Sequence, residues 1–176
     1  MDDLAKALAA DLDKTFPELV GRLQHGVFSG LRQLTGDHHQ AEDLTQEAFI
    51  RAYRAMQSYQ AERIRTMRLR SWVWTIALNL LRNQARAESR RPRQDPLQEA
   101  GYWPTEPPDS PAWRRRWTLL PAAQRTAVIL RHVAGLSYQE ISEATGRPPS
   151  TVRSDVRRGL GRLRSIIAEE EDRSTK

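Results

Sequence analysis

The sequence predicts an all-α protein built from two small helical domains that are joined by an extended linker. Apolar residues recur at spacings of three and four along most of the chain, which is typical of amphipathic helices, and no segment shows the alternating pattern of a β-strand. Six of the ten prolines lie between Arg91 and Pro111, and proline disfavours helix because it fixes φ and lacks a backbone N–H group. We therefore expect domains at residues 1–90 and 112–176, separated by an irregular linker at 91–111.

Three helix patterns precede the linker. The first covers residues 16–34, and Pro17 suits its first helical position because an N–H group is not needed there. The second follows Asp37, which forms a capping pair with Gln40. The third runs from about 71 to 88 and carries one continuous apolar stripe.

Four helix patterns follow the linker. Ser110 is suited to cap a short helix, and a second helix covers residues 122–134. Ser137 opens a third, short helix that stops at Gly146, and Pro149 opens the long last helix. A short capped helix, a tight turn at glycine and a second helix together predict a helix-turn-helix, which places its second helix in the DNA major groove.

The charge of the chain favours an anionic partner. The formal net charge is +6 and the isoelectric point is about 10.3. Nearly all of the positive charge is arginine, whose planar side chain binds phosphate and guanine in a bidentate manner, so nucleic acid is favoured over membrane. An arginine-rich genome would raise the same count, and charge alone therefore does not establish function.

Several locations and covalent features are excluded by composition. The chain has no cysteine and so forms no disulfide. Residues 1–14 contain four aspartates and no apolar run, which excludes a secretory signal. No stretch approaches the roughly 20 apolar residues of a membrane span. We expect a soluble, cytoplasmic protein without membrane insertion.

An enzymatic role is not favoured. The four histidines do not combine with carboxylates at a metal-ligand spacing, and the adjacent pair His38 and His39 is expected to be solvated. No nucleophile with a neighbouring base and no phosphate-binding loop appears. We expect no catalytic residue, no metal and no cofactor.

The predicted second helix of the helix-turn-helix presents a polar, basic face. Its N-terminal amides also favour a phosphate nearby. The alternative is an ordinary helical hairpin with a solvated face. The candidate DNA-binding residues on this face are Ser150, Thr151, Arg153, Ser154, Asp155, Arg157 and Arg158.

Two further polar faces lie in the N-terminal half. The face of the helix after Asp37 is either solvated or a surface for a partner helix; its candidate residues are Asp43, Gln46, Glu47, Arg51 and Arg54. The helix over 71–88 presents a face suited to nucleic acid, and an arginine-rich segment, 59–70, precedes it. Trp74 is either a core residue or an aromatic ring that stacks on a displaced base. The candidates on this helix and just before it are Arg70, Trp74, Asn79, Arg82, Asn83 and Arg86.

Four sequence segments resemble those of the extracytoplasmic-function sigma factors of bacterial RNA polymerase. The C-terminal half carries GLSYQEI at 135–141 and STVRSDV at 150–156, which are similar to the promoter-binding region four of that family. The N-terminal half carries EDLTQEAF at 42–49, similar to the polymerase-binding segment. It also carries WVWTIALN at 72–79, similar to the helix that reads the downstream promoter element.

The resemblance implies a non-enzymatic protein that binds core RNA polymerase and promoter DNA. It implies that the residues after 149 read the −35 element and that residues 70–86 read and open the −10 element, with a flipped base captured by the segment before that helix. It further implies that the face at 43–54 contacts the β-prime clamp helices, that the C-terminal domain contacts the β flap, and that an anti-sigma factor is a regulatory partner.

The chain departs from the family pattern at three positions. Leu78 and Asp155 stand where family members often carry basic residues, and Gly159 stands where they usually carry alanine. Asp155 is suited to accept from a cytosine amine or to pair with Arg158 or Arg162. Two other functions fit the sequence less well. A simple DNA-binding regulator leaves the N-terminal motifs unexplained, and a nucleic-acid enzyme would need a group of reactive side chains that the sequence does not show.

Overall fold

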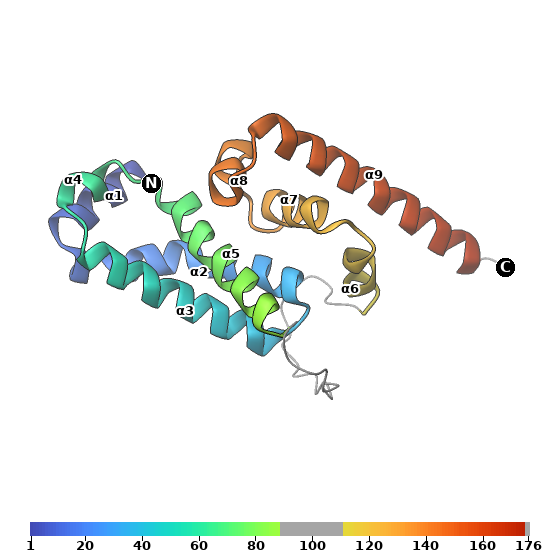
Figure 1. The fold of residues 1–176 in the computed structure, drawn as a ribbon, viewed down its shortest axis with the longest axis horizontal. Helices are drawn as coiled ribbons and strands as arrows, with labels where there is room; N and C mark the ends of the chain where they lie inside the picture. The colour runs from blue at the N-terminus through green and yellow to red at the C-terminus, as the bar shows by residue number, and fades with distance from the viewer. Residues whose placement is uncertain (89–110, 175–176) are drawn as a thin grey trace.

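The computed structural model describes residues 1–88 and 111–174, and within them it contains nine α-helices and no strand. Figure 1 shows these helices in two groups, α1 to α5 and α6 to α9. The all-α prediction is confirmed. The linker expected at 91–111 lies outside the described residues, apart from Pro111, and so does the expected cap Ser110.

The N-terminal group contains three long helices and two short ones. Residues 59–70, which the sequence left without a helix, contain one of the short helices, α4. Helix α1 was not predicted from the sequence either. The bounds are α1 Asp2–Ala10, α2 Leu12–Thr35, α3 His38–Gln57, α4 Ala61–Arg65 and α5 Leu69–Glu88.

Helix α2 begins earlier than the sequence predicted. Asp11 caps it by accepting a hydrogen bond from the Lys14 backbone N–H at 3.1 Å, so the helix starts at Leu12 and Pro17 lies inside it. The prediction that Pro17 occupies the first helical position is therefore wrong. The helix ends as predicted at Gly36, which has a φ of 74°, a value that glycine adopts without steric cost.

The C-terminal group contains the predicted helix-turn-helix. Ser137 and Glu140 form a complete capping box at the start of α8, and Gly146, with a φ of 71°, ends that helix. Pro149 then begins α9, as expected. The bounds are α6 Pro111–Thr118, α7 Ala122–His132, α8 Tyr138–Thr145 and α9 Pro149–Ser174.

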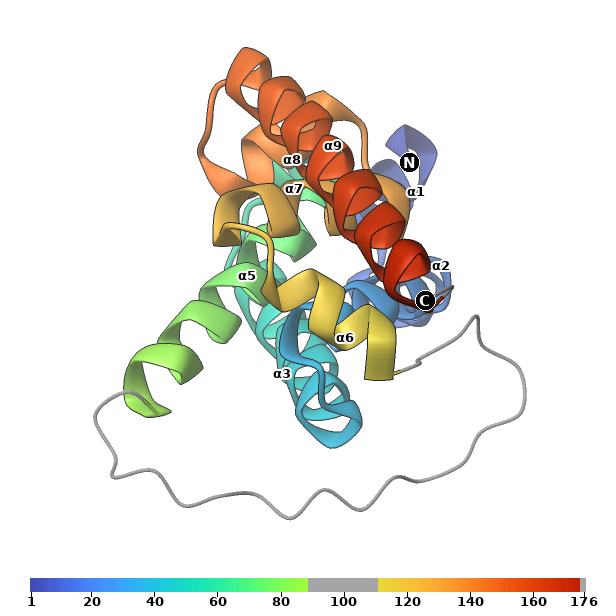
Figure 2. The ribbon, with the colours of Figure 1, turned by 90° about the vertical axis from the view of Figure 1, so that its right-hand side faces the viewer.

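A close approach of α7 and α9 explains the glycine at 159. A Cβ atom built on Gly159 would lie 2.6 Å from Cγ2 of Val128 and 3.3 Å from the backbone oxygen of Gln124. Any larger residue would therefore push α9 away from α7. Figure 2 shows α9 running beside α7, with α6 near the C-terminal half of α9.

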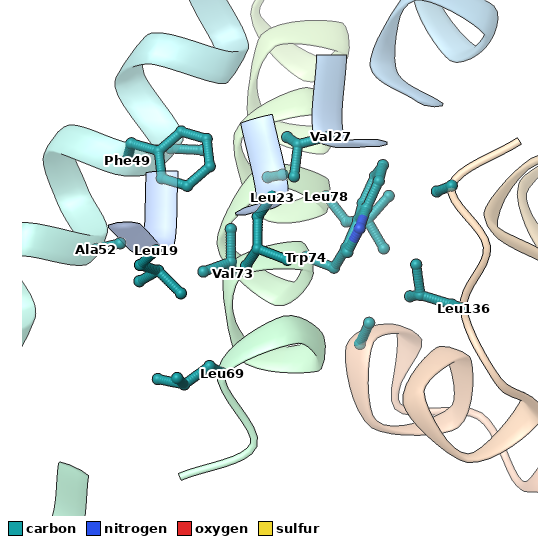
Figure 3. Close-up of a cluster of buried hydrophobic side chains, with 14 of the residues drawn as sticks. Leu19, Leu23, Val27, Phe49, Ala52, Leu69, Val73, Trp74, Leu78 and Leu136 are labelled. Carbon is teal, nitrogen blue, oxygen red and sulfur yellow. The ribbon is translucent and has the colours of Figure 1, made fainter. Parts of the chain in front are cut away.

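The main hydrophobic core extends across both helical groups. Figure 3 shows side chains of α2, α3 and α5 gathered together with Leu136, which lies in the turn between α7 and α8. The members contributed by the C-terminal group are Leu130, Ala134, Leu136, Ile141, Ala144 and Val152. A smaller cluster joins α6, α7 and α9 and includes Trp117 and Leu163. The two groups therefore share one core in addition to their own packing.

Candidate nucleic-acid interface

The helix-turn-helix has an apolar inner face and a basic outer face. Ile141, Ala144, Val152 and Val156 are buried and hold α8 against α9. The predicted residues on the other side of α9 reach solvent at least in part. Ser150, Arg153, Arg157 and Arg158 are exposed, and Thr151 and Ser154 are half-buried. The structure thus brings these six predicted residues together on the first two turns and a half of one helix.

Tyr138, the first residue of α8, contacts an arginine of the basic face. The Arg153 guanidinium lies 5.4 Å from the centre of the Tyr138 ring, and the Arg131 guanidinium lies 5.0 Å from the same centre. Contacts of this kind restrain a long cationic side chain. The sequence did not single out this aromatic ring, because its neighbours come from α7 and α9 and meet only in the folded chain.

Asp155 does not belong to the basic face. Its side chain is buried, with 6% of the residue exposed, and it forms an ion pair with Arg147 at 3.0 Å, without the alignment of a hydrogen bond. Position 155 follows Val152 by three residues, so it shares the inward side of the helix. The expectation that Asp155 contacts DNA is corrected by this burial, and Arg147, rather than Arg158 or Arg162, is its partner.

Helix α5 presents a second polar face. The predicted residues Asn79, Arg82, Asn83 and Arg86 are all exposed, and Arg82 donates a hydrogen bond to the Asn79 side-chain oxygen at 2.9 Å. The spacing places them along one side of the helix. The structure brings these four predicted residues together.

Trp74 and Arg70 face the C-terminal group instead of solvent. Trp74 is only 1% exposed and lies in the shared core. Arg70 is half-buried and donates a hydrogen bond to the Ala134 backbone oxygen at 2.7 Å. In this arrangement Trp74 is not accessible to a base, and Arg70 is held by region-spanning contacts with a third of its side chain exposed. Of the two alternatives for Trp74, core packing is the one observed. Leu78 is also buried, with 3% of the residue exposed.

The arginine-rich segment before α5 carries a stacked group of side chains. The Arg63 guanidinium lies 3.6 Å from the centre of the Tyr59 ring, and that ring meets Trp72 edge-on at 6.0 Å. Ile64 is buried and anchors α4 below them. The sequence identified the segment but not this grouping, which depends on the short helix that it did not predict.

The outer face of α3 is mostly polar. Asp43, Gln46, Arg51 and Arg54 are exposed, and Glu47 accepts a hydrogen bond from Arg51 at 2.6 Å. These predicted residues therefore share one surface. Among them lies Ile50, which is 44% exposed and is not one of the residues predicted from the sequence. An exposed branched apolar side chain on a charged face is suited to anchor a partner helix.

Within residues 1–88 and 111–174, no group of three or more histidine or acidic side chains has an arrangement that could hold a metal. No helix in that part of the chain is sufficiently long and apolar to cross a membrane.

Each of the two helical groups matches the model of a known protein family. Residues 19–91 match the model of Sigma-70 region 2, and residues 115–163 match that of Sigma-70, region 4. The chain is 34% identical over 162 residues to the ECF RNA polymerase sigma-E factor of Escherichia coli K12, and the match covers 81% of each protein. The chain belongs to the ECF sigma factors of RNA polymerase.

Further relatives agree with this family. The chain is 32% identical over 164 residues to the ECF RNA polymerase sigma factor SigE of Mycolicibacterium smegmatis. That match covers 88% of this chain and 62% of the relative. The fold is similar to the sigma factor RpoE of Bartonella quintana, solved with the anti-sigma factor NepR. That similarity has a TM-score of 0.70 at 24% identity over 88% of this chain and 98% of the other. In this sigma factor α5 thus lies in region 2, and the helix-turn-helix lies in region 4.

Proposed function

We propose that this sigma factor binds core RNA polymerase and directs it to promoters by reading the −35 element with α9 and the −10 element with α5. The observation that carries the proposal is the basic outer face of α9, mounted on a capped helix-turn-helix in a chain that matches both sigma regions. The protein acts in the cytoplasm as a transcription initiation factor without a catalytic site of its own.

The −35 contacts are assigned to the first turns of α9. The backbone amides at the helix start favour a phosphate, and arginine side chains in the major groove bind guanine edges in a bidentate manner. The exposure of Arg153 and Arg157 supports them as base-reading residues, with Tyr138 positioning Arg153. The assigned set is Ser150, Thr151, Arg153, Ser154, Arg157 and Arg158.

The −10 contacts are assigned to the exposed face of α5. Asn79, Arg82, Asn83 and Arg86 form this face, and the Tyr59–Arg63 stack offers an aromatic surface to an unstacked base. Extracting a base costs a few kcal/mol, and stacking on an aromatic ring returns about 1–3 kcal/mol. Arg70 and Trp74 join this set only if the two helical groups separate.

The polymerase contact is assigned to the outer face of α3, which docks on the β-prime clamp helices, while region 4 docks on the β flap. Charged pairs on α3 give the contact its direction, and Ile50 supplies an apolar anchor. The assigned charged and polar residues are Asp43, Gln46, Glu47, Arg51 and Arg54.

An anti-sigma factor is the proposed regulatory partner. A hollow of about 400 Å³ lies between α5 and the C-terminal helices, with Leu78, Leu81 and Ala127 among its lining residues. An apolar segment of a partner protein is suited to such a hollow.

Run-off transcription with purified core polymerase tests the proposal. The wild-type protein should direct specific initiation from a subset of genomic fragments. Arg153→Ala should lower initiation by about 5- to 150-fold, the cost of losing one bidentate base contact. Glu169→Ala, on the exposed far part of α9, serves as the control and should leave initiation unchanged. Specific binding to duplex DNA without polymerase, and no specific transcript with it, would instead identify a simple DNA-binding regulator.

A further inference from the structure

Helix α1 lies outside the segment that matches Sigma-70 region 2, which covers residues 19–91. It is nevertheless packed tightly on the rest of its group. Leu4 and Leu8 lie on its buried side and are 3% and 1% exposed. The Thr15 hydroxyl of α2 donates a hydrogen bond to the Ala7 backbone oxygen at 3.3 Å. The assigned promoter and polymerase contacts include no residue of α1, so its packing needs another explanation.

Besides the adjoining α2, the helix on which α1 packs is α4. In the described part of the chain, α1 is the one helix with which α4 packs extensively, and Figure 1 shows the two side by side. Ile64 is the buried residue of α4, at 4% exposed, and it belongs to the same core as Leu4 and Leu8. Helix α4 therefore rests on α1 more than on the long helices of its group.

Helix α4 has little intrinsic stability. It contains five residues, and a helix this short is not stable by itself because nucleation costs more than a single turn of hydrogen bonds returns. Gln60, at its N-terminal cap, makes no side-chain hydrogen bond to the helix. The ion pair of Arg65 with Glu62 at 3.3 Å joins two side chains that are more than half exposed, and such pairs contribute little. Packing on α1 therefore decides whether α4 keeps its helical turn.

The Tyr59–Arg63 stack depends on the position of α4. Tyr59 follows α3 directly, and its ring meets Trp72 of α5 edge-on at 6.0 Å, so the long helices hold the aromatic half of the stack. Arg63 is exposed and belongs to α4, and its guanidinium lies 3.6 Å from the centre of the Tyr59 ring. A displaced α4 would carry Arg63 off the ring. The shape of the stack is therefore set by the helix that α1 supports.

We propose that α1 is a positioning element for promoter opening, because its packing on α4 holds Arg63 over Tyr59 in the arrangement that receives an unstacked base. This role rests on the function proposed for the stack. Leu4 and Leu8 are positioning residues that touch no nucleotide and act through α4. A preformed stack needs no ordering when the base arrives. Loosening α4 lowers the fraction of molecules with a competent stack, and opening falls in proportion to that fraction.

Amide hydrogen exchange of the full-length protein tests the support of α4 by α1. Leu8→Ala should accelerate exchange in α4, where the Ile64 N–H group donates to the Gln60 backbone oxygen at 3.3 Å, and should change α3 and α5 much less. Leu31→Ala is the matched control, since it truncates a leucine of α2 that is 0% exposed, and it should not single out α4. Leu8→Met keeps the side-chain volume and should restore protection. Leu8→Val gives a milder perturbation that shows the same pattern if Leu8→Ala does not fold.

Permanganate reactivity of unpaired thymines in holoenzyme–promoter complexes tests the effect on opening. Leu8→Ala should lower opening, with a ceiling of about 5- to 150-fold, the range for losing one base–aromatic stack. Its affinity for core polymerase should stay unchanged. Tyr59→Ala should cause a loss within the same range. Adding Leu8→Ala to Tyr59→Ala should lower opening little further, because α1 acts through the stack that Tyr59→Ala has already removed.

The outcomes separate the role of α1 from the function proposed for the stack. Unchanged exchange of α4 in Leu8→Ala, or an acceleration equally large in Leu31→Ala, overturns the role of α1 alone. Losses that multiply in the double variant with Tyr59→Ala also overturn it, because a general loss of stability would act in that way. Normal opening by Tyr59→Ala instead overturns the function of the stack on which the role of α1 rests, even where α4 exchanges as expected.

Discussion

Replacing Gly159 by alanine should destabilise the C-terminal group, although alanine is the better helix former. The new Cβ atom would lie 2.6 Å from Cγ2 of Val128, which is 1% exposed and, being β-branched, has one strongly preferred rotamer in a helix. Overpacking of this kind costs about 1–3 kcal/mol, and the gain in helix propensity returns about 1 kcal/mol. The net loss of about 1 kcal/mol should lower Tm by about 2–4 °C, measured by far-ultraviolet circular dichroism.

Gly161 provides the matched control two residues further along α9. It is exposed, and a Cβ atom there would meet nothing within 4 Å. Gly161→Ala should therefore raise the free energy of unfolding by up to about 1 kcal/mol, because only the propensity gain remains. Opposite signs for the two glycines are the expected result. An equal stabilisation by both substitutions would refute the close approach of α7 and α9.

Three other predictions concern separate parts of the molecule. Ser137→Ala should cost about 1 kcal/mol in thermal unfolding, because it removes half of the capping box at the start of α8; retention of full stability would count against that box. Ile50→Asp should weaken binding to core polymerase at least tenfold in a titration with labelled protein, while leaving Tm unchanged because the side chain is exposed; unaltered affinity would remove α3 from the polymerase contact. The hydrogen bond that Tyr53 donates to Asp13 at 2.6 Å raises the pKa of the Tyr53 hydroxyl above its ordinary value. The stabilising contribution of this hydrogen bond should be complete below about pH 10 and be lost as pH rises through the raised pKa. Tyrosinate absorbance should therefore appear at higher pH in wild type than in Asp13→Asn. Identical titrations of the two proteins would contradict the interaction.

Local signals made the C-terminal helices predictable. The Ser137 capping box, the stop at Gly146 and the start at Pro149 each depend on residues within one turn, and all three appear in the structure. The start of α2 was missed because Asp11 was not recognised as its cap. Helix α1 was missed because it is short and begins with two aspartates, so the spacing of Leu4 and Leu8, both of which are buried, is a weak helical pattern.

The candidate site was predictable where a side chain faces solvent from a helix. Periodicity assigns Asn79 and Arg153 to outer faces because that assignment depends only on the helix itself. Periodicity does not reveal which other element packs on a given face. For this reason the predicted DNA-binding residues included Trp74, Arg70 and Asp155. Their partners lie on other elements or across a turn, and only the folded chain brings them together.

The shared core also bears on how this chain can be divided for experiments. Expressing region 2 alone would leave Trp74 and Leu78 without the α7–α8 side chains that now cover them, and the matching surface of region 4 would lose its cover at Leu136 and Ile141. Contiguous apolar patches of this kind promote self-association. Fragments cut between the two groups should therefore aggregate more readily than the intact chain, and a solubilising substitution at Trp74 or Leu78 would be needed to study region 2 by itself.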